Sequence, residues 1–271
     1  MASVELEAVT ENVVAIRLNR PERLNAIDFG LVADLHDRLD EVAAQDGCKV
    51  VILTGNGRGF SAGLDLKEFG VVPGPGQHRH FPAGQTGQNF LASLTEHIRA
   101  TPQIVLAAVN GVAYGGGLSL SLACDLRIAG TSATFCSAFI RTGLTGTDAG
   151  VSYLLPRLIG ASRAFDMIIT GRTVDAPEAE KLGIVSRVVP DGALWDEAVA
   201  MATLIAGYTT YGLRNTKEVL WHNLDTNSMG AAIALENRNQ DLGSKNDEVR
   251  AYMRDYAARR RRPSGGDDDR T

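Results

Sequence analysis

The segment IVLAAVNGVAYGGGLSL, residues 104–120, contains the pattern that decides the fold class. Its first part, Ile104–Val109, is a short apolar run, which predicts a buried strand. Three consecutive glycines, Gly115–Gly117, then lead into an apolar helix that we expect to continue to about Cys124. A strand, a glycine-rich turn and a helix in direct succession indicate an α/β fold.

The same alternation of strands and helices extends on both sides of this segment to about residue 190. We expect further strands at Val4–Val9, Val13–Leu18, Lys49–Thr54 and Asp125–Ala129, and helices from Asp28 to about Gln45, at Gln88–Ala100 and at Val151–Leu158. From Leu194 onward the apolar spacing is helical only. We therefore predict a core of residues 1–193 and a helical C-terminal subdomain of residues 194–258.

Two segments lack any periodic pattern. Residues 70–87 are rich in Gly, Pro and His and are interpreted as a mobile loop inserted in the core. Residues 259–271 are charged, have nothing to bury, and are predicted to form a disordered tail.

The composition excludes several classes of protein. The 271 residues have a formal net charge of −5, which argues against a broad nucleic-acid-binding surface. The first 20 residues lack the apolar run of a signal peptide, and no apolar stretch is long enough to cross a membrane. Three cysteines without metal-ligand spacing favour a reducing compartment. We therefore expect a cytoplasmic protein.

Two glycine turns carry the chemical signal. The first glycine turn is Thr54–Lys67 (TGNGRGFSAGLDLK) and the second glycine turn is Asn110–Ser119 (NGVAYGGGLS). Neither contains G-x-G-x-x-G or a Walker A loop, which removes the usual argument for nucleotide chemistry. Glycines let the backbone approach a ligand closely, and a helix leaves its first N–H groups unpaired. Two such turns facing each other would form an oxyanion hole, and close packing of helix against strand is the alternative explanation.

Around these turns the chain resembles the enoyl-CoA hydratase/isomerase (crotonase) superfamily over roughly residues 4–258. The matching motifs are NRPERLNA (19–26), FSAGLDLK (60–67), AVNGVAYGGG (108–117), Cys124-Asp125, LPRLIG (155–160), LGIV (182–185) and NTK (215–217). The resemblance implies a crotonase-like spiral of repeated strand–strand–helix units, with a C-terminal helical part and assembly as a homotrimer or hexamer. It also implies that the N–H groups of Leu64 and Gly116 stabilise a thioester enolate.

The resemblance further implies where coenzyme A binds. The residues expected to contact it are Arg23, Leu24, Ala26, Ala62, Asp65, Leu66, Lys67 and Lys217. Asp65 and Leu66 should lie near the adenine, and Lys67 and Lys217 near the phosphates. The alternative for each lysine is an ordinary solvated charge.

The chain departs from the hydratases of this family at two positions. Hydratases use two glutamates to hold and deprotonate water, and the corresponding residues here are Ser119 and Phe139, which we expect to line the acyl pocket. Neither side chain can act as a general base at neutral pH, which argues against hydration by the usual mechanism. Ser119 also lacks the G-x-S-x-G frame of a nucleophile.

One acid, Asp148, is the candidate catalytic residue. The resemblance places it close to the position where some isomerases and a dehalogenase of the family have a working aspartate. One base that takes a proton from one carbon and returns it to another performs an isomerisation. The alternative is that Asp148 only caps the helix that begins at Val151, because Asp is a favoured N-cap.

The histidines of the loop, His78 and His80, could line an acyl pocket or bind a metal adventitiously. Because neither has a partner acid at metal-ligand spacing, we predict no metal site.

The predicted function is the isomerisation of an enoyl-CoA in fatty acid metabolism, with an acyl-CoA thioester as the partner molecule and no cofactor besides the coenzyme A of the substrate. A non-catalytic acyl-CoA-binding protein that kept the pocket and lost the acids is the alternative. Enoyl-CoA hydration and dehalogenase-like attack by Asp148 are weaker options. Nucleic acid and membrane partners are not expected.

Overall fold

The structure is a computed structural model that describes residues 2–74 and 76–261. The contacts divide the chain into two compact units, of which the first ends at Ala206 and the second begins at Gly207. Each unit is described by itself. Among the described residues, no helix combines the length and the apolar character that a membrane crossing requires.

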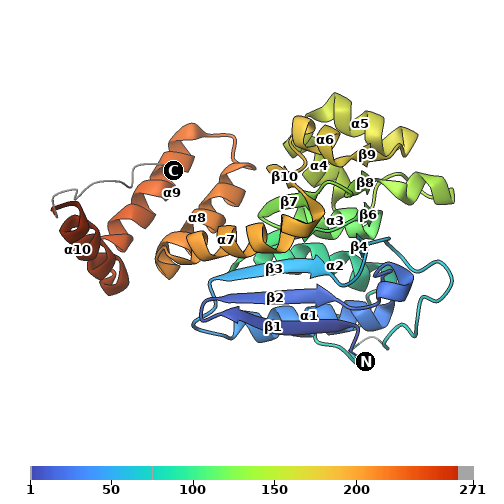
Figure 1. Cartoon of the computed structure of the whole chain (residues 1–271), viewed down its shortest axis with the longest axis horizontal. Coiled ribbons are helices and arrows are strands. Elements are labelled where there is room, and N and C mark those ends of the chain that lie inside the picture. The colour runs from blue at the N-terminus through green and yellow to red at the C-terminus, as the bar shows by residue number, and fades with distance from the viewer. Residues whose placement is uncertain (1, 75, 262–271) are drawn as a thin grey trace. The chain divides into compact units, whose positions relative to one another are not determined.

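The first unit contains a large and a small β-sheet (Figure 1). The strand order in the large sheet is β1 (Val4–Thr10), β2 (Val13–Leu18), β3 (Val50–Gly55), β5 (Ile104–Val109), β7 (Leu126–Gly130) and β10 (Arg187–Val189). The order in the small sheet is β4 (Gly59–Ser61), β6 (Val112–Tyr114), β8 (Thr134–Cys136) and β9 (Val174–Asp175). The strands are parallel except for the hairpin of β1 with β2 and the pairing of β8 with β9.

A repeated strand–strand–helix unit builds this arrangement. The first repeat is β3, β4 and α2 (Gly87–Ala100), the second is β5, β6 and α3 (Gly116–Ala123), and the third is β7, β8 and α4 (Val151–Ile159). In each repeat the first strand joins the large sheet and the second joins the small sheet. The predicted crotonase-like spiral is therefore confirmed.

The central strands of the large sheet are buried on both faces, to which their successive side chains point alternately. On β5, Val105, Ala107 and Val109 belong to the main core, while Leu106 and Ala108 pack with a second apolar cluster on the other face. This explains why the strand reads as a continuous apolar run rather than as an alternating one.

The second face is covered by α7 (Leu194–Ala206), whose residues Leu194, Ala198 and Ala202 are buried in the same cluster as Leu106. They recur every four residues and so form one face of the helix. The prediction had placed this helix in the C-terminal subdomain. The structure instead assigns it to the first unit, so the boundary lies at Ala206 rather than at residue 193.

The remaining helices of the first unit are α1 (Phe29–Ala43), α5 (Ala161–Thr170), α6 (Ala176–Leu182) and the short 3-10 turns η1 (Pro21–Arg23), η2 (Ala138–Thr142) and η3 (Asp191–Ala193). As predicted, Asp28 caps α1: its Oδ1 accepts a hydrogen bond of 2.7 Å from the N–H of Leu31. This bond satisfies one of the N–H groups that the first turn of a helix leaves unpaired.

The second unit is helical, with α8 (Thr210–Asn223), α9 (Met229–Gly243) and α10 (Asp247–Arg261). Because α10 extends to Arg261, the prediction of a disordered tail from residue 259 is wrong for residues 259–261. The rest of that tail, 262–271, lies outside the described residues. A pocket of about 530 Å³ lies among these three helices and is lined by none of the predicted site residues.

Candidate active site

The two glycine turns lie directly against each other. A Cβ atom placed on Gly63 would lie 2.5 Å from the carbonyl oxygen of Tyr114 and 3.3 Å from the backbone nitrogen of Gly116. No side chain larger than that of glycine fits at Gly63, and its φ of +86° is also one that glycine adopts without strain. The contact joins Gly63, the residue before the predicted oxyanion donor Leu64, to Gly116, which is itself the other predicted donor.

Each glycine turn contains a short strand that the sequence did not predict. The first turn includes β4 and the second includes β6, and these strands pair in parallel within the small sheet. This pairing holds the two turns in register.

The backbone N–H of Leu64 points away from the segment that contains Ile27. Leu64 forms an isolated parallel bridge with Ile27, in which the N–H of Ile27 donates to Gly63 and its carbonyl oxygen accepts from Asp65. In a parallel bridge of this kind the residue between the two bonded neighbours directs its own N–H and C=O to the opposite side. The N–H of Leu64 is therefore not consumed by this bridge.

Gly116 is the first residue of α3, so its N–H has no acceptor within the helix. The residue before it, Gly115, has φ +50° and ψ −118°, and its N–H donates to the carbonyl oxygen of Cys136. The next residue, Gly117, must also be glycine, because a Cβ on it would lie 2.2 Å from the carbonyl oxygen of Ser61.

Ser119 and Phe139 converge on Gly115. The Ser119 hydroxyl is buried and donates to the carbonyl oxygen of Gly115 at 3.3 Å. The half-buried ring of Phe139, on η2, lies 3.6–3.9 Å from the position that a Cβ of Gly115 would occupy. The two positions at which the resemblance expects glutamates are thus both beside the second glycine turn.

Asp148 is half-buried in the turn before α4. Its Oδ1 accepts hydrogen bonds of 2.6 Å from Nε2 of Gln88 and from the N–H of Ala149. Capping of α4 by Asp148 is contradicted, because the N-cap residue is Gly150 and no side chain caps the helix. Ala149 has φ +42°, a strained conformation for a residue with a Cβ.

Helix α2 holds this turn at a second point, since the Thr95 hydroxyl donates to the carbonyl oxygen of Ala149 at 2.9 Å. Gln88 was not predicted as a site residue. Its exposed position at the start of a helix gives no sequence signal, because only the fold brings it to Asp148.

The predicted coenzyme A segment is held by buried polar contacts. Arg20 bridges Asp28 and Asp65 at 3.1 and 3.0 Å, and Asp65 also accepts from the N–H groups of Lys67 and Glu68 at 3.1 Å each. Burial opposes ionisation of Asp65, but these hydrogen bonds and the Arg20 charge outweigh it, so that the pKa of Asp65 lies below its ordinary value. The carboxylate therefore shapes the backbone of this segment.

The other predicted contacts differ in exposure. Ala26 is buried, Leu24 has φ +52°, and Arg23 forms an ion pair of 2.9 Å with Glu68. Ala62 is half-buried and donates its N–H to the carbonyl oxygen of Leu24.

Leu66 and Lys67 are exposed, and Leu66 keeps 63% of its surface accessible. Lys217 lies on α8 in the second unit and is buried at 8% exposure, so it is not an ordinary solvated charge. Whether Lys217 contacts coenzyme A stays a prediction.

A histidine cluster that the sequence did not predict lies where the 70–87 segment meets α1 and α2. His36 on α1 is fully buried, and His80 and His97 stack against it with ring centroids 4.4 and 5.0 Å away. Burial lowers the pKa of His36 to about 3, and the neighbouring His80 and His97 add to this effect. Burial and His80 likewise lower the pKa of His97 to about 4, so both imidazoles are neutral at pH 7.

Comparison with known proteins agrees with this fold. The chain belongs to the enoyl-CoA hydratase/isomerase family, whose model matches residues 8–265. A probable enoyl-CoA hydratase of Mycobacterium tuberculosis is 44% identical over 237 residues, which are 88% of this chain and 83% of the relative.

Two solved structures are similar over most of their length. A probable enoyl-CoA hydratase/isomerase from Mycobacterium abscessus gives a TM-score of 0.87 at 36% identity, over 100% of each chain. A monofunctional enoyl CoA isomerase from M. smegmatis gives a TM-score of 0.73 at 41% identity, over 86% of this chain and 99% of the isomerase.

Proposed function

We propose that this member of the family isomerises an enoyl-CoA through a thioester enolate, with Leu64 and Gly116 as oxyanion donors. The contact between Gly63 and Gly116 is the observation that carries the proposal. It brings one N–H that its bridge leaves unused next to one N–H at the start of a helix. Donors that are already oriented toward a developing negative charge stabilise it without reorganisation, and losing one costs about 10²–10³ in rate.

In this proposal Asp148 moves the proton. Its carboxylate takes a proton from the carbon next to the thioester carbonyl, and the electron pair moves toward the carbonyl oxygen. The same group then returns the proton to the far end of the double bond, which completes the shift. Gln88 and the N–H of Ala149 orient Oδ1 and leave Oδ2 for the transfer.

Hydration has less support than isomerisation. The two positions beside Gly115 where this family's hydratases are expected to carry glutamates hold Ser119 and Phe139. Neither deprotonates water at neutral pH. The M. smegmatis structure named as an isomerase supports the preference.

The absence of the two glutamates also favours a second candidate, a non-catalytic acyl-CoA-binding protein. A chain without the two carboxylates could hold the thioester in the oxyanion hole and carry out no proton transfer. In either case coenzyme A enters with the substrate. The exposure of Leu66 and Lys67 supports the proposal that they contact its adenine and phosphates.

We also propose that the chain assembles as a homotrimer or hexamer in the cytoplasm. The second unit buries few apolar side chains, while Leu220, Met229 and Met253 keep 56%, 79% and 62% of their surface exposed. Apolar surface of this extent is typical of a face that a partner covers. A native mass three or six times that of the 28.9 kDa chain is expected by mass photometry, and a monomer would contradict the proposal.

The function is tested by incubating the protein with saturated and unsaturated acyl-CoAs in heavy water and following mass and absorbance. A shifted double bond, or deuterium exchanged into the position next to the thioester, supports the isomerase. Tight binding without exchange supports the carrier. A covalent acyl-CoA adduct on Asp148, visible by mass spectrometry, would instead indicate dehalogenase-like attack.

A further inference from the structure

Four of the five histidines of the chain gather at one place in the first unit. His36 comes from α1, His97 from α2, and His78 and His80 from the segment between β4 and α2. Phe90 stacks against His36 at 5.2 Å and closes the cluster on its inner side.

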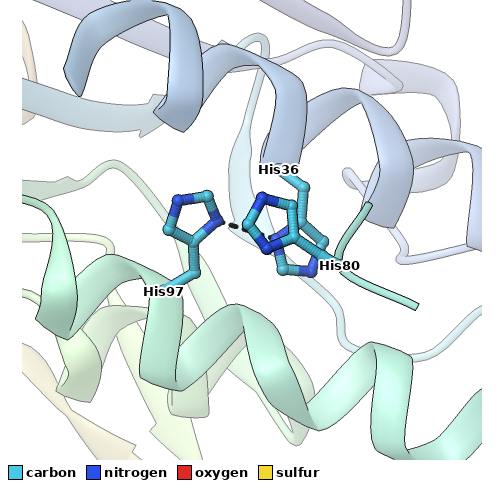
Figure 2. Close-up of side chains that lie close together, drawn as sticks. All are labelled: His36, His80 and His97. Atoms are coloured by element: carbon cyan, nitrogen blue, oxygen red, sulfur yellow. Dashed lines mark hydrogen bonds between the residues drawn. The ribbon is translucent and has the colours of Figure 1, made fainter. Parts of the chain in front are cut away.

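The ligand atoms of three of these histidines converge. One ring nitrogen each of His36, His80 and His97 lie within 4.8 Å of one another, and Figure 2 shows the three rings lying close together. A tetrahedral metal with bonds of 2.0–2.1 Å sets its ligand nitrogens roughly 3.3 Å apart. Small side-chain rotations therefore suffice to bring the three nitrogens to that spacing.

A carboxylate lies beside the same nitrogens. Asp40, one helical turn after His36 on α1, lies 2.8 Å from Nε2 of His80 through Oδ2 and 3.3 Å from Nε2 of His97 through Oδ1. Arg79 contacts Oδ1 of Asp40 at 2.5 Å from the exposed side. Three imidazoles and one carboxylate form a ligand set that divalent transition metals of the zinc type prefer.

The hydrogen-bond network of the cluster lacks one proton. The hydroxyl of Ser93 donates to the carbonyl oxygen of Phe90, so Nε2–H of His36 must donate to Ser93. Nδ1 of His36 is then an acceptor, and its contact of 2.8 Å requires that Nδ1–H of His97 donates. In neutral His97 this leaves the lone pair of Nε2 facing a carboxylate oxygen of Asp40, an arrangement that a cation between them relieves. His36 binds such a cation through the Nδ1 lone pair, which then gives up its contact with His97.

We propose that His36, His80 and His97, with Asp40 as the fourth ligand, bind a divalent transition metal of the zinc type. The metal would join α1 and α2 to the segment of residues 76–86, which carries His80. His78 supports the site from outside, since its Nδ1 accepts from the N–H of His80 at 3.2 Å. The site is independent of the proposed isomerase chemistry.

The direct test is metal binding by the full chain. Protein prepared without a polyhistidine tag and stripped with a chelator is titrated with Zn²⁺ against a chromophoric competitor, and with Co²⁺ followed by absorbance. We expect one Zn²⁺ per chain and saturable Co²⁺ bands in the visible range. A chain that takes up neither ion at stoichiometric concentration contradicts the site.

Two variants separate the cluster from adventitious histidine binding. His80→Gln removes a ligand from a segment that contains no helix or strand among its described residues, so the fold should survive. Its affinity for Zn²⁺ should fall by more than the roughly 10–100-fold typical of losing a second-shell partner. His222→Gln, at an exposed histidine outside the cluster, should bind like the parent. Equal affinity of His80→Gln and the parent overturns the proposal.

Hydrogen exchange supplies an independent readout. Zn²⁺ should slow amide exchange in residues 76–86 of the parent chain and leave it unchanged in His80→Gln. Zn²⁺ that binds the parent without slowing exchange in this segment would place the ion elsewhere and refute the assignment.

Discussion

Nε2 of Gln88 donates a hydrogen bond of 2.6 Å to Oδ1 of Asp148. The bond links the first turn of α2 to the turn before α4, two elements separated by 60 residues in the sequence. It holds Oδ1 of the carboxylate in place and so orients Oδ2, the oxygen to which the proposal assigns proton transfer. Three of the predictions below concern the geometry around this carboxylate and the two glycine turns.

Replacing Gln88 by Met should lower turnover of an enoyl-CoA about tenfold to 100-fold, because small misplacements of a catalytic group cost this much. The KM should change little, since Gln88 is not among the predicted coenzyme A contacts. Steady-state kinetics measure both values. Gln85→Met, at an exposed glutamine three residues earlier, is the matched control and should behave like the parent. Equal turnover of the two variants would remove Gln88 from the positioning role.

Asp148→Asn should reduce turnover by about 10²–10⁴, the usual contribution of a general base. The amide oxygen of Asn can still accept from Gln88 and Ala149, so the fold and acyl-CoA binding should persist. Isothermal titration with a saturated acyl-CoA checks binding, and deuterium exchange checks proton transfer. Asp46→Asn, at an exposed acid after α1, serves as control. Parental exchange in Asp148→Asn would exclude Asp148 as the base.

Gly63→Ala should destabilise the chain by about 2–5 kcal/mol, combining overpacking with left-handed strain. Its Cβ would meet the Tyr114 carbonyl at 2.5 Å and push the glycine turns apart, so exchange activity should fall as well. Gly143→Ala is the matched control, with a similar φ of +82° but no atom within 4 Å of the new Cβ. It should show only the strain, about 1–2 kcal/mol in urea unfolding. Similar losses in both variants would mean that the close approach contributes little.

Asp65→Asn should lower the free energy of unfolding at neutral pH by about 1.5–3 kcal/mol, the value of hydrogen bonds to a charged group. Because the pKa of Asp65 is lower in the folded chain than in the unfolded one, its ionised form stabilises the fold above the unfolded pKa of about 3.9. This stabilisation disappears as the pH falls through the lower folded value. Urea unfolding at descending pH should therefore show the parent and the variant converging below about pH 4. A difference independent of pH would assign the loss to packing instead.

Much of the first unit was predictable from local patterns. The central strands of the large sheet appear as apolar runs because both of their faces are buried, and Asp28 marks the start of α1 by its capping chemistry. The small sheet was missed because its strands have only two or three residues, too few for a periodic pattern. The placement of α7 was missed because its apolar face reads the same whether it packs on a sheet or on other helices.

Only the part of the candidate site that has a local sequence signal was predictable. The glycine turns signalled a close approach, and the structure brings Gly63 to Gly116. The histidine cluster gave no such signal, because its members come from three segments that only the fold unites. The spacing of His36 and Asp40 by four residues on a predicted helix was the one available sign, since it puts both on one face.

The connections from the second strand of each repeat to its helix differ greatly in length. Between β6 and α3 only Gly115 intervenes, while the chain between β4 and α2 extends from Ala62 to Thr86. Insertions or deletions in the part of this connection after Lys67 alter neither sheet and leave both glycine turns in place. Length changes in that part of the chain can thus alter what lies around the two glycine turns without moving them, whereas an insertion at Gly115 displaces the N–H of Gly116.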